Sequence, residues 1–322
     1  MKTSSAEFIK KLFLEAFEIS GSLFRIMIPL IVAIKILQEI GGVTFLGNLL
    51  APVMELVGLP GSMGLVWATA ILVNIYAGII AFVALMAANP LTVAQTTVLT
   101  LMMLVAHNLP VELRIAQKAG VRLRFMLLLR MGAAFLFGWV TFRIYQWGGW
   151  LQELNTAKWV PPVEESSLAT WAVSQLRDLM LIFIIILALV LLMKILARIG
   201  ITGIMIRVLN PILKLLGIGP SASTITIIGM TLGLAYGGGL IIKEAVSGRL
   251  DRRDVLFSLT LMALSHSLIE DTLLMAILGA DFSGILWGRI LLSLLAVFFL
   301  VKLISRLPER ILNRFIVRTP KA

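Results

Sequence analysis

The sequence has no cysteine, only two histidines and few charged residues, and each shortage excludes classes of protein. Of the 322 residues, 14% are charged, against about 25% in a typical soluble domain. Without cysteine, disulfide scaffolds, Cys-ligated zinc, iron–sulfur clusters and thiol catalysis are excluded. Hydrophobic residues make up 59% of the chain, more apolar surface than a water-soluble fold of this size buries. This composition predicts an all-α polytopic membrane protein whose first partner is the lipid bilayer.

The net charge of +11 does not indicate a nucleic-acid partner. Lysine and arginine are spread among apolar stretches, as in the cytoplasmic loops of membrane proteins. Motifs of common enzymes are also missing from the sequence: it has no H-E-x-x-H, no G-x-S-x-G and no phosphate-binding P-loop. We therefore expect neither an enzyme nor a bound cofactor, and no nucleic acid.

An internal repeat relates the two halves of the chain without gaps. His266 follows His107 by 159 residues, and other rare residues recur at the same offset. Matches of histidine, proline and charged residues at one offset indicate a duplication. Further pairs at this offset are Lys35 with Lys194, Gly41 with Gly200, Pro52 with Pro211, Gly58 with Gly217, Gly78 with Gly237, Glu112 with Asp271, Arg130 with Arg289, and Arg143 with Lys302.

The basic loops exchange places between the two repeats. Residues 113–124 carry four lysines and arginines, whereas the equivalent residues 272–283 carry none. Conversely, 243–254 carry four and the equivalent 84–95 carry none. Because short basic loops lie on the cytoplasmic side, this exchange predicts two inverted-topology repeats of about five helices each, with short or broken helices. Such an inversion requires an odd number of crossings in each repeat.

The expected organisation places both termini in the cytoplasm. An interfacial amphipathic helix is predicted at 1–19, although a simple extension of the first crossing helix explains that pattern equally well. We expect a linker without net positive charge outside the cell. The predicted segments are 1–19, the first repeat 20–146, the linker and start of the next helix 147–178, the second repeat 179–305 and a basic tail 306–322. The predicted crossings are 20–40, 43–57, 62–87, 91–112 and 124–146, then 170–198, 202–217, 220–243, 254–272 and 284–305.

Two matched polar segments are the first candidates for a substrate site. Ionisable residues inside a span are costly and mark functional positions by default, and histidine binds protons, metals or hydroxyls near neutral pH. The alternative is that each histidine only joins two helices by a hydrogen bond. With the nearby carboxylates, the histidines also suit a divalent ion, and the sequence leaves metal binding open. The candidates are His107, Asn108 and Glu112, with His266, Ser267, Glu270 and Asp271.

A run of three glycines marks a second candidate segment. Tyr236 is followed by Gly237, Gly238 and Gly239, and this run predicts an unwound backbone that faces a ligand. The alternative role for these glycines is helix packing, because small residues spaced by four let helices approach closely. In the first repeat, the polar counterparts are Asn74 and Tyr76.

The arginines Arg130 and Arg289 also match between the repeats. Both are expected within a turn or two of a span end, where lipid headgroups are the usual partners of an arginine side chain.

Each half resembles the nucleoside-recognition, or gate, domain. The resemblance rests on LLAPVM at 49–54 with LVGLP at 56–60, and on LNPIL at 209–213 with LGIGP at 216–220. The glycine-rich helix and the SHSLIED segment that follow fit the same pattern. Related domains occur in spore-maturation membrane proteins, in the membrane part of ferrous-iron transporters and in relatives of concentrative nucleoside transporters. The resemblance implies a transporter-like protein of the bacterial cytoplasmic (inner) membrane.

The sequence therefore favours a secondary carrier for a small polar solute, possibly a nucleoside-like compound. Inverted repeats are the common architecture of such carriers. A divalent metal cation permease and a non-transport scaffold subunit of a membrane assembly are the alternatives, and a lipid-processing enzyme ranks lowest. The partners expected are lipid and a small-molecule or ion substrate, and a homo-oligomer is compatible with the sequence.

Overall fold

The computed structural model describes residues 5–86, 88–156 and 168–320, and these residues form helices and no strand. In chain order the α-helices and π-helical turns (η) are α1 (Ser5–Glu39), α2 (Gly42–Glu55), α3 (Met63–Leu72), α4 (Ile75–Met86), α5 (Val93–Val105), α6 (Leu109–Lys118), α7 (Leu123–Gly148), α8 (Leu168–Ile199), α9 (Ile201–Leu215), α10 (Pro220–Leu232), α11 (Leu234–Val246), α12 (Arg252–Ser265), α13 (Glu270–Ile277), η1 (Ser283–Gly288), α14 (Arg289–Ser305), α15 (Glu309–Ile311) and η2 (Leu312–Ile316). The all-α polytopic fold predicted from composition is confirmed.

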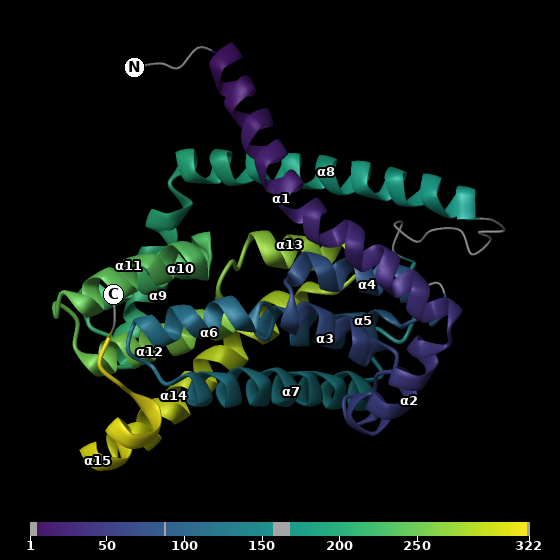
Figure 1. Cartoon of the computed structure of the whole chain (residues 1–322). Coiled ribbons are helices and arrows are strands. Elements are labelled where there is room, and N and C mark those ends of the chain that lie inside the picture. Colours follow the sequence, from purple (N-terminus) through teal and green to yellow (C-terminus); the bar gives the residue numbers. More distant parts are fainter. Residues whose placement is uncertain (1–4, 87, 157–167, 321–322) are drawn as a thin grey trace.

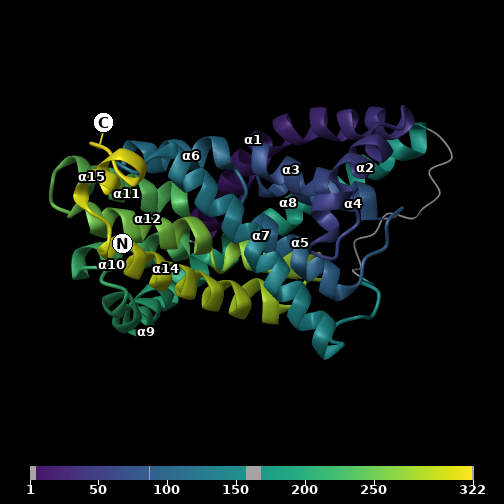
Figure 2. The ribbon, with the colours of Figure 1, turned by 90° about the horizontal axis from the view of Figure 1, so that it is seen from below.

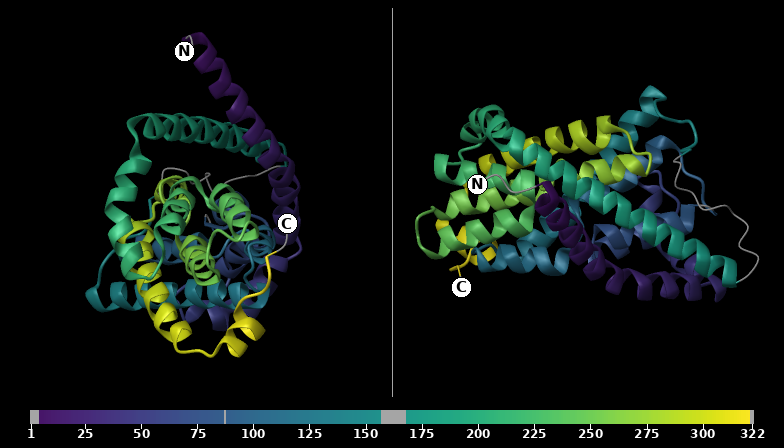
Figure 3. Two further views of the ribbon diagram at one scale, coloured as in Figure 1. Left: turned by 90° about the vertical axis from the view of Figure 1, so that its left-hand side faces the viewer. Right: turned by 90° about the horizontal axis from the view of Figure 1, so that it is seen from above.

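Five helical segments of the described chain are long and apolar enough to cross a membrane. They are Val93–Lys118, Leu123–Gly148, Thr170–Leu196, Arg252–Ile277 and Ser283–Ser305. The bent pair of Ile28–Glu39 and Gly42–Glu55 adds a sixth candidate. In the first and fourth segments 72% and 67% of the most apolar stretch is buried, against 18% in α8. The spans α5–α6 and α12–α13 are therefore central, while α1 and α8 pack together on the outside (Figures 1 and 3).

One end of the molecule, called here the linker end, is formed by residues 149–156 with the start of α5 and the end of α13. Asn155 connects all three, because its Nδ2 donates to Thr96 Oγ1 at 3.0 Å and to the Leu278 carbonyl at 2.7 Å. Its backbone N–H donates to the Leu91 carbonyl at 2.8 Å. The start of the first central span thus adjoins the finish of the second.

The opposite end, called here the basic end, brings the two basic loops together with the C-terminal segment. A cavity there is lined by Gly120, Gly248 and Arg252. The backbone N–H of Arg318 donates to the Gly120 carbonyl at 2.8 Å. Because α5–α6 finishes at this end and α12–α13 begins here, the two equivalent spans run in opposite directions, as the exchanged basic loops predict.

Helix ends recur at the 159-residue offset. Gly58 and Gly217 adopt left-handed φ angles of 72° and 74° after α2 and α9. In both repeats the backbone N–H of the residue after this glycine donates to a carbonyl of the last helical turn at 3.0 Å, Leu59 to Met54 and Ile218 to Leu213, which is the helix stop that glycine favours. Gly41 and Gly200 share left-handed φ angles of 74° and 80° before those helices. The repeat therefore governs backbone conformation as well as sequence.

Two segments expected to cross the membrane as single helices are hairpins instead. The first of them, predicted at 62–87, contains α3 and α4, and the second, predicted at 220–243, lies in α10 and α11; the breaks are at Val73–Asn74 and at Gly233. The arms of each hairpin touch: a Cβ built on Gly237 would lie 2.3 Å from the Gly229 Cα. The two hairpins lie towards opposite ends of the molecule (Figures 1 and 2).

The prediction of five crossings in each repeat is therefore wrong, and the structure supports three. The candidate spans of the first repeat are the bent pair of Ile28–Glu39 with α2, α5–α6 and α7, and those of the second are α8, α12–α13 and η1–α14. α2 leaves α1 at 89°, and α9 turns away from α8 (Figure 3). Three is still odd, so the inversion is preserved. An uncharged run of 56 residues is long enough for two crossings or for a hairpin, and its composition does not distinguish them.

The N-terminal residues do not form a separate helix. α1 is continuous from Ser5 to Glu39, which agrees with the alternative of an extended first crossing helix.

The C-terminal segment is attached to the start of α7. The Arg122 side chain donates to the carbonyls of Asn313 and Val317 at 2.6 and 3.1 Å. Residues 157–166 of the predicted linker lie outside the described residues.

Candidate functional site

Both central spans are interrupted, and a histidine lies within each interruption. α5 ends at Val105 and α6 begins at Leu109, while α12 ends at Ser265 and α13 begins at Glu270. The residues that follow the histidines, Asn108 and Ser267, have left-handed φ angles of 49° and 48°. For a residue with a side chain, this conformation costs about 1–2 kcal/mol. The same strain at equivalent positions of both repeats indicates a site that needs this backbone.

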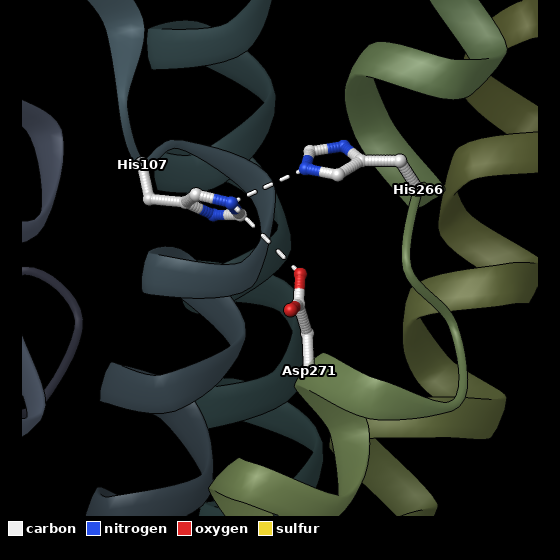
Figure 4. Close-up of side chains that lie close together, drawn as sticks. All are labelled: His107, His266 and Asp271. Carbon is white, nitrogen blue, oxygen red and sulfur yellow. Dashed lines mark hydrogen bonds and ion pairs between the residues drawn. The ribbon is translucent and has the colours of Figure 1, made fainter. Parts of the chain in front are cut away.

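The two histidines are buried and face each other. His107 is 6% exposed and His266 is 3% exposed. Each Nδ1 lies 2.9 Å from the carbonyl oxygen of the residue four positions earlier, Met103 or Met262. A carbonyl only accepts hydrogen bonds, so each Nδ1 carries the proton and donates it. In neutral rings both Nε2 atoms are then lone-pair acceptors, and they lie 3.2 Å apart (Figure 4).

Two carboxylates from the following helices complete the group that we call the His–carboxylate cluster: His107, His266, Glu112 and Asp271. Glu112 Oε1 lies 3.4 Å from the His266 Nε2 and 3.6 Å from the His107 Nε2. Asp271 Oδ2 lies 3.9 Å from the His107 Nε2 (Figure 4). This buried oxygen has no hydrogen-bond partner among the described residues. Acceptor atoms from both repeats therefore gather here, and those of His107, His266 and Asp271 lie within 4.8 Å of one another.

Arg130 lies inside the protein, which corrects the expectation that it contacts lipid headgroups. It is fully buried, forms an ion pair with Glu112 and donates from Nε to the Val105 carbonyl at 2.9 Å. The Val105 carbonyl belongs to the last turn of α5, where carbonyls lack partners within the helix. An arginine at this point satisfies that group and complements the negative end of the helix dipole.

Arg289 has the equivalent place in the second repeat and is also fully buried, so the lipid assignment is wrong for it as well. Its Nε donates to the Leu264 carbonyl at 3.1 Å. Its Nη2 donates to the carbonyls of His266 at 2.8 Å and Leu104 at 3.1 Å. The sequence did contain a signal for this arrangement. Arg130 matches Arg289 at the same offset at which Glu112 matches Asp271, so each repeat carries one matched base and one matched acid.

The tip of each hairpin meets the break of a central span. The backbone N–H of Asn108 donates to the Ala70 carbonyl at 2.9 Å. In the second repeat, the N–H of Leu268 donates to the Met230 carbonyl at 2.8 Å. A Cβ on Gly233, at the tip of the second hairpin, would lie 2.8 Å from Ser267 Oγ. The hairpins are thus coupled to the backbone that carries the histidines.

Three of the predicted polar residues lie beside the cluster and not in it. Tyr76 donates its hydroxyl hydrogen to Glu270 Oε1 at 3.1 Å, which links the first hairpin to α13. The Asn74 side chain accepts from the Ala77 N–H at 2.9 Å and so caps the start of α4. Of the adjacent acids, Asp271 faces the histidines, while Glu270 is bonded to the hairpin.

The glycine run does not unwind its helix, contrary to the prediction. α11 is continuous through residues 237–239, and the break lies earlier, at Gly233. Gly237 packs against Gly229, and a Cβ on Gly238 would lie 2.4 Å from Ile115 of α6, whereas Gly239 has open space around it. Close packing is therefore the physical role of the first two glycines. The side chain of Tyr236 lies outside the described residues.

The two ends of the molecule differ in how tightly the repeats are joined. At the linker end, the Asp281 N–H donates to Thr97 Oγ1 at 2.9 Å, and the hydroxyls of Tyr145 and Ser283 lie 2.7 Å apart. At the basic end, a cavity of about 510 Å³ separates the loop at Gly120 from the segment 245–255. Hydrogen bonds thus join the repeats at the linker end, and a cavity lies between their loops at the basic end.

Comparison with known proteins places the chain among membrane proteins. It is 28% identical over 300 residues to the uncharacterized membrane protein YvoD of Bacillus subtilis, a match that covers 89% of this chain and 93% of that protein. No protein-family model and no solved structure matches the chain. The match agrees with the membrane location read from composition, and it does not carry the resemblance to nucleoside-recognition domains.

Proposed function

We propose that the protein is a secondary carrier that moves a small polar or ionic solute across the bacterial cytoplasmic membrane, without an enzymatic step. The observation that carries the proposal is the His–carboxylate cluster at the pseudo-twofold centre. It lies where two antiparallel spans break and where the tips of two hairpins arrive. In carriers with inverted repeats, substrate sites lie at the repeat interface, on discontinuous helices.

The difference between the two ends supports a transport cycle. A carrier exposes its site to one side at a time by rocking one repeat against the other. Hydrogen bonds join the repeats at the linker end, and the cavity of about 510 Å³ opens at the basic end. By the positive-inside rule the basic end is cytoplasmic, which places both termini inside and makes this the inward-facing arrangement.

The spacing of the cluster favours an ion over a nucleoside-like solute. Its facing atoms are 3.2–3.9 Å apart, which leaves room for one atom between them. A nucleoside-like substrate, suggested by the gate-domain resemblance, requires the hairpin tips to move away from the spans. A scaffold role, in which the polar network only locks helices together, requires no movement at all.

Cysteine accessibility in this cysteine-free chain tests the proposal without knowledge of the substrate. Thr97→Cys lies at the closed linker end and Ala245→Cys lines the cavity at the basic end. In purified protein in lipid nanodiscs, a carrier shows reactivity with a maleimide at Ala245→Cys. Reactivity at Thr97→Cys then rises under conditions in which reactivity at Ala245→Cys falls. Fixed reactivity at both positions across a panel of solutes would support the scaffold role.

Flux in proteoliposomes provides the second test. Uptake of uridine and of Mn²⁺ is compared between the wild type and the double variant His107→Gln/His266→Gln, with the exposed Arg249→Gln as control. The proposal expects loss of uptake only in the histidine variant, with unchanged helix content by circular dichroism. Equal uptake by the wild type and the double variant would overturn it.

A further inference from the structure

We propose that the His–carboxylate cluster is a binding site for a divalent transition-metal cation. The ion is coordinated by the Nε2 atoms of His107 and His266 and by oxygens of Asp271 and Glu112. That such an ion is the transported substrate rests on the proposed carrier function, whereas binding itself does not.

The first support is the distance between the ring nitrogens. In a tetrahedral site with metal–nitrogen bonds of about 2.0–2.1 Å, two nitrogen ligands lie about 3.3–3.4 Å apart. The two Nε2 atoms here are 3.2 Å apart. A tetrahedral oxygen ligand at about 2.0–2.2 Å lies about 3.3–3.5 Å from each nitrogen, and Glu112 Oε1 lies 3.4 and 3.6 Å from them. Three ligand positions are therefore close to tetrahedral spacing, and Asp271 Oδ2, which lies 3.9 Å from the His107 Nε2, must move closer to complete the site.

The second support is an excess of lone pairs. Both Nδ1 hydrogens are donated to carbonyls, so no N–H is directed into the 3.2 Å space between the rings. Two imidazole lone pairs that face each other repel, and the unpartnered Asp271 Oδ2 adds a buried acceptor at the same place. A cation at this place satisfies the facing lone pairs and the Asp271 oxygen together. The bonds from Nδ1 to the carbonyls are also the usual outer-shell partners of metal-ligating histidines.

The C-terminal ends of two helices add negative electrostatic potential at the cluster. α5 and α12 both terminate at the cluster, and the C-terminal end of a helix carries a partial negative charge. Arg130 and Arg289 occupy the terminal carbonyls of Val105 and Leu264, so those carbonyls are not available as ligands. The coordinating atoms are therefore the side chains alone.

The donor set indicates which cations bind. Two imidazoles with carboxylates suit Zn²⁺, Fe²⁺, Co²⁺ or Mn²⁺, while Mg²⁺ and Ca²⁺ prefer all-oxygen sites. Structural zinc sites commonly use cysteine thiolates, and this sequence contains none. A site of nitrogen and oxygen donors without thiolates suits an ion that must also be released.

Cobalt provides a direct test on the purified protein in nanodiscs. Titration of wild-type protein with Co²⁺ is expected to show saturable binding at one ion per chain. The visible absorption should be the intense band of a tetrahedral ion, and Zn²⁺ should displace it. The weak spectrum of octahedral Co²⁺, or no saturable binding of Co²⁺, Zn²⁺, Mn²⁺ or Fe²⁺, would overturn the proposal.

Adjacent acids supply a matched pair of variants. Asp271→Asn is expected to weaken Co²⁺ binding by at least about 100-fold, the upper figure for loss of an outer-shell partner. Glu270→Gln removes a carboxylate at the neighbouring position, which is bonded to Tyr76 and not to the histidines, and should bind Co²⁺ within about threefold of wild type. Equal weakening in both would show a general charge effect and refute the site.

Failure of the site and failure of the carrier function give different results. If Co²⁺ does not bind but His107→Gln/His266→Gln abolishes uridine uptake, the carrier proposal stands and the metal site is wrong. If Co²⁺ binds with the expected spectrum but neither Mn²⁺ nor uridine is taken up, the site is correct and the carrier function is wrong. If the histidine variants do not fold, the wild-type spectrum alone decides the metal site.

Discussion

The two repeats share one backbone but differ in the side chains placed on it. At equivalent positions the first repeat has Asn74 and Tyr76 where the second has Gly233 and Ala235. Both histidines and both arginines are retained, and the left-handed backbone conformation recurs at the residue after each histidine. The retained residues are those that shape and cap the interrupted helices. The residues that differ lie at the hairpin tips, so the two hairpins are chemically different at equivalent positions.

The sharpest difference concerns the matched acids. Glu112 forms an ion pair with Arg130, whereas the Asp271 Oδ2 has no hydrogen-bond partner among the described residues. Arg289 donates to three carbonyls instead, and one of them, that of Leu104, belongs to the first repeat. Aspartate is one methylene shorter than glutamate. The duplication thus yields one neutralised acid and one free acid at a single centre, which is what a cation site requires.

The largest expected effect is on stability, when the neutralised acid loses its partner. Arg130→Met leaves Glu112 as an uncompensated buried charge and should cost about 3–5 kcal/mol. Adding Glu112→Gln should recover part of this loss, because the isolated charge is removed. Thermal unfolding in nanodiscs measures both variants. A destabilisation below about 1 kcal/mol for Arg130→Met would contradict the burial of this pair.

Lengthening the free acid should make the second repeat resemble the first. Asp271→Glu brings the carboxylate within reach of Arg289, as in the first repeat, and withdraws it from the histidines. We expect Co²⁺ affinity and Mn²⁺ uptake to fall about 10–100-fold, the range seen when the surroundings of a metal site are altered. The matched control, Glu112→Asp/Asp271→Glu, exchanges the two acids between the repeats and indicates whether one free acid in either repeat is enough. Unchanged affinity in Asp271→Glu would show that the two acids are interchangeable.

The two hairpins can be compared through their glycines. Gly237→Ala places a Cβ 2.3 Å from the Gly229 Cα, so the arms must separate, and a loss of about 1–3 kcal/mol follows. In the first hairpin, Gly78→Ala meets the Ala70 Cβ and the Met103 Cε, each at 2.7 Å, and should cost less because the approach is less close and the Met103 side chain is flexible. Gly239→Ala meets nothing within 4 Å and should stabilise α11 by about 0.5–1 kcal/mol. The order of the three melting temperatures is the measurement.

The smallest structural effect is expected from labelling the two ends. Gln152→Cys lies exposed at the linker end and Ser247→Cys lies exposed at the basic end, and neither should alter stability by more than about 0.5 kcal/mol. On intact cells, a membrane-impermeant maleimide should label Gln152→Cys and leave Ser247→Cys unlabelled until the cells are opened. The reverse pattern would invert the orientation while leaving the fold intact.

The sequence predicted features that depend on composition and on the repeat. The scarcity of charge indicated a membrane protein, and the offset between His107 and His266 identified equivalent positions. The exchanged basic loops predicted antiparallel repeats, and the contacts at the two ends of the molecule agree. Orientation in the cell and the binding role of the histidines stay predictions. The sequence did not reveal the hairpins, because apolar residues are equally acceptable against lipid and against other helices.

The tertiary structure alone decided which polar groups meet. Arg130 looked like a residue for lipid headgroups, and only the packing of α7 against α5 turns it towards the Val105 carbonyl. Glu270 and Asp271 are neighbours in the chain, yet successive residues of a helix point about 100° apart, so one bonds Tyr76 and the other faces the histidines. The sequence by itself determined that two polar segments are equivalent. Their meeting point, and the one acid left without a partner, depend on helix rotation and packing, which no linear pattern encodes.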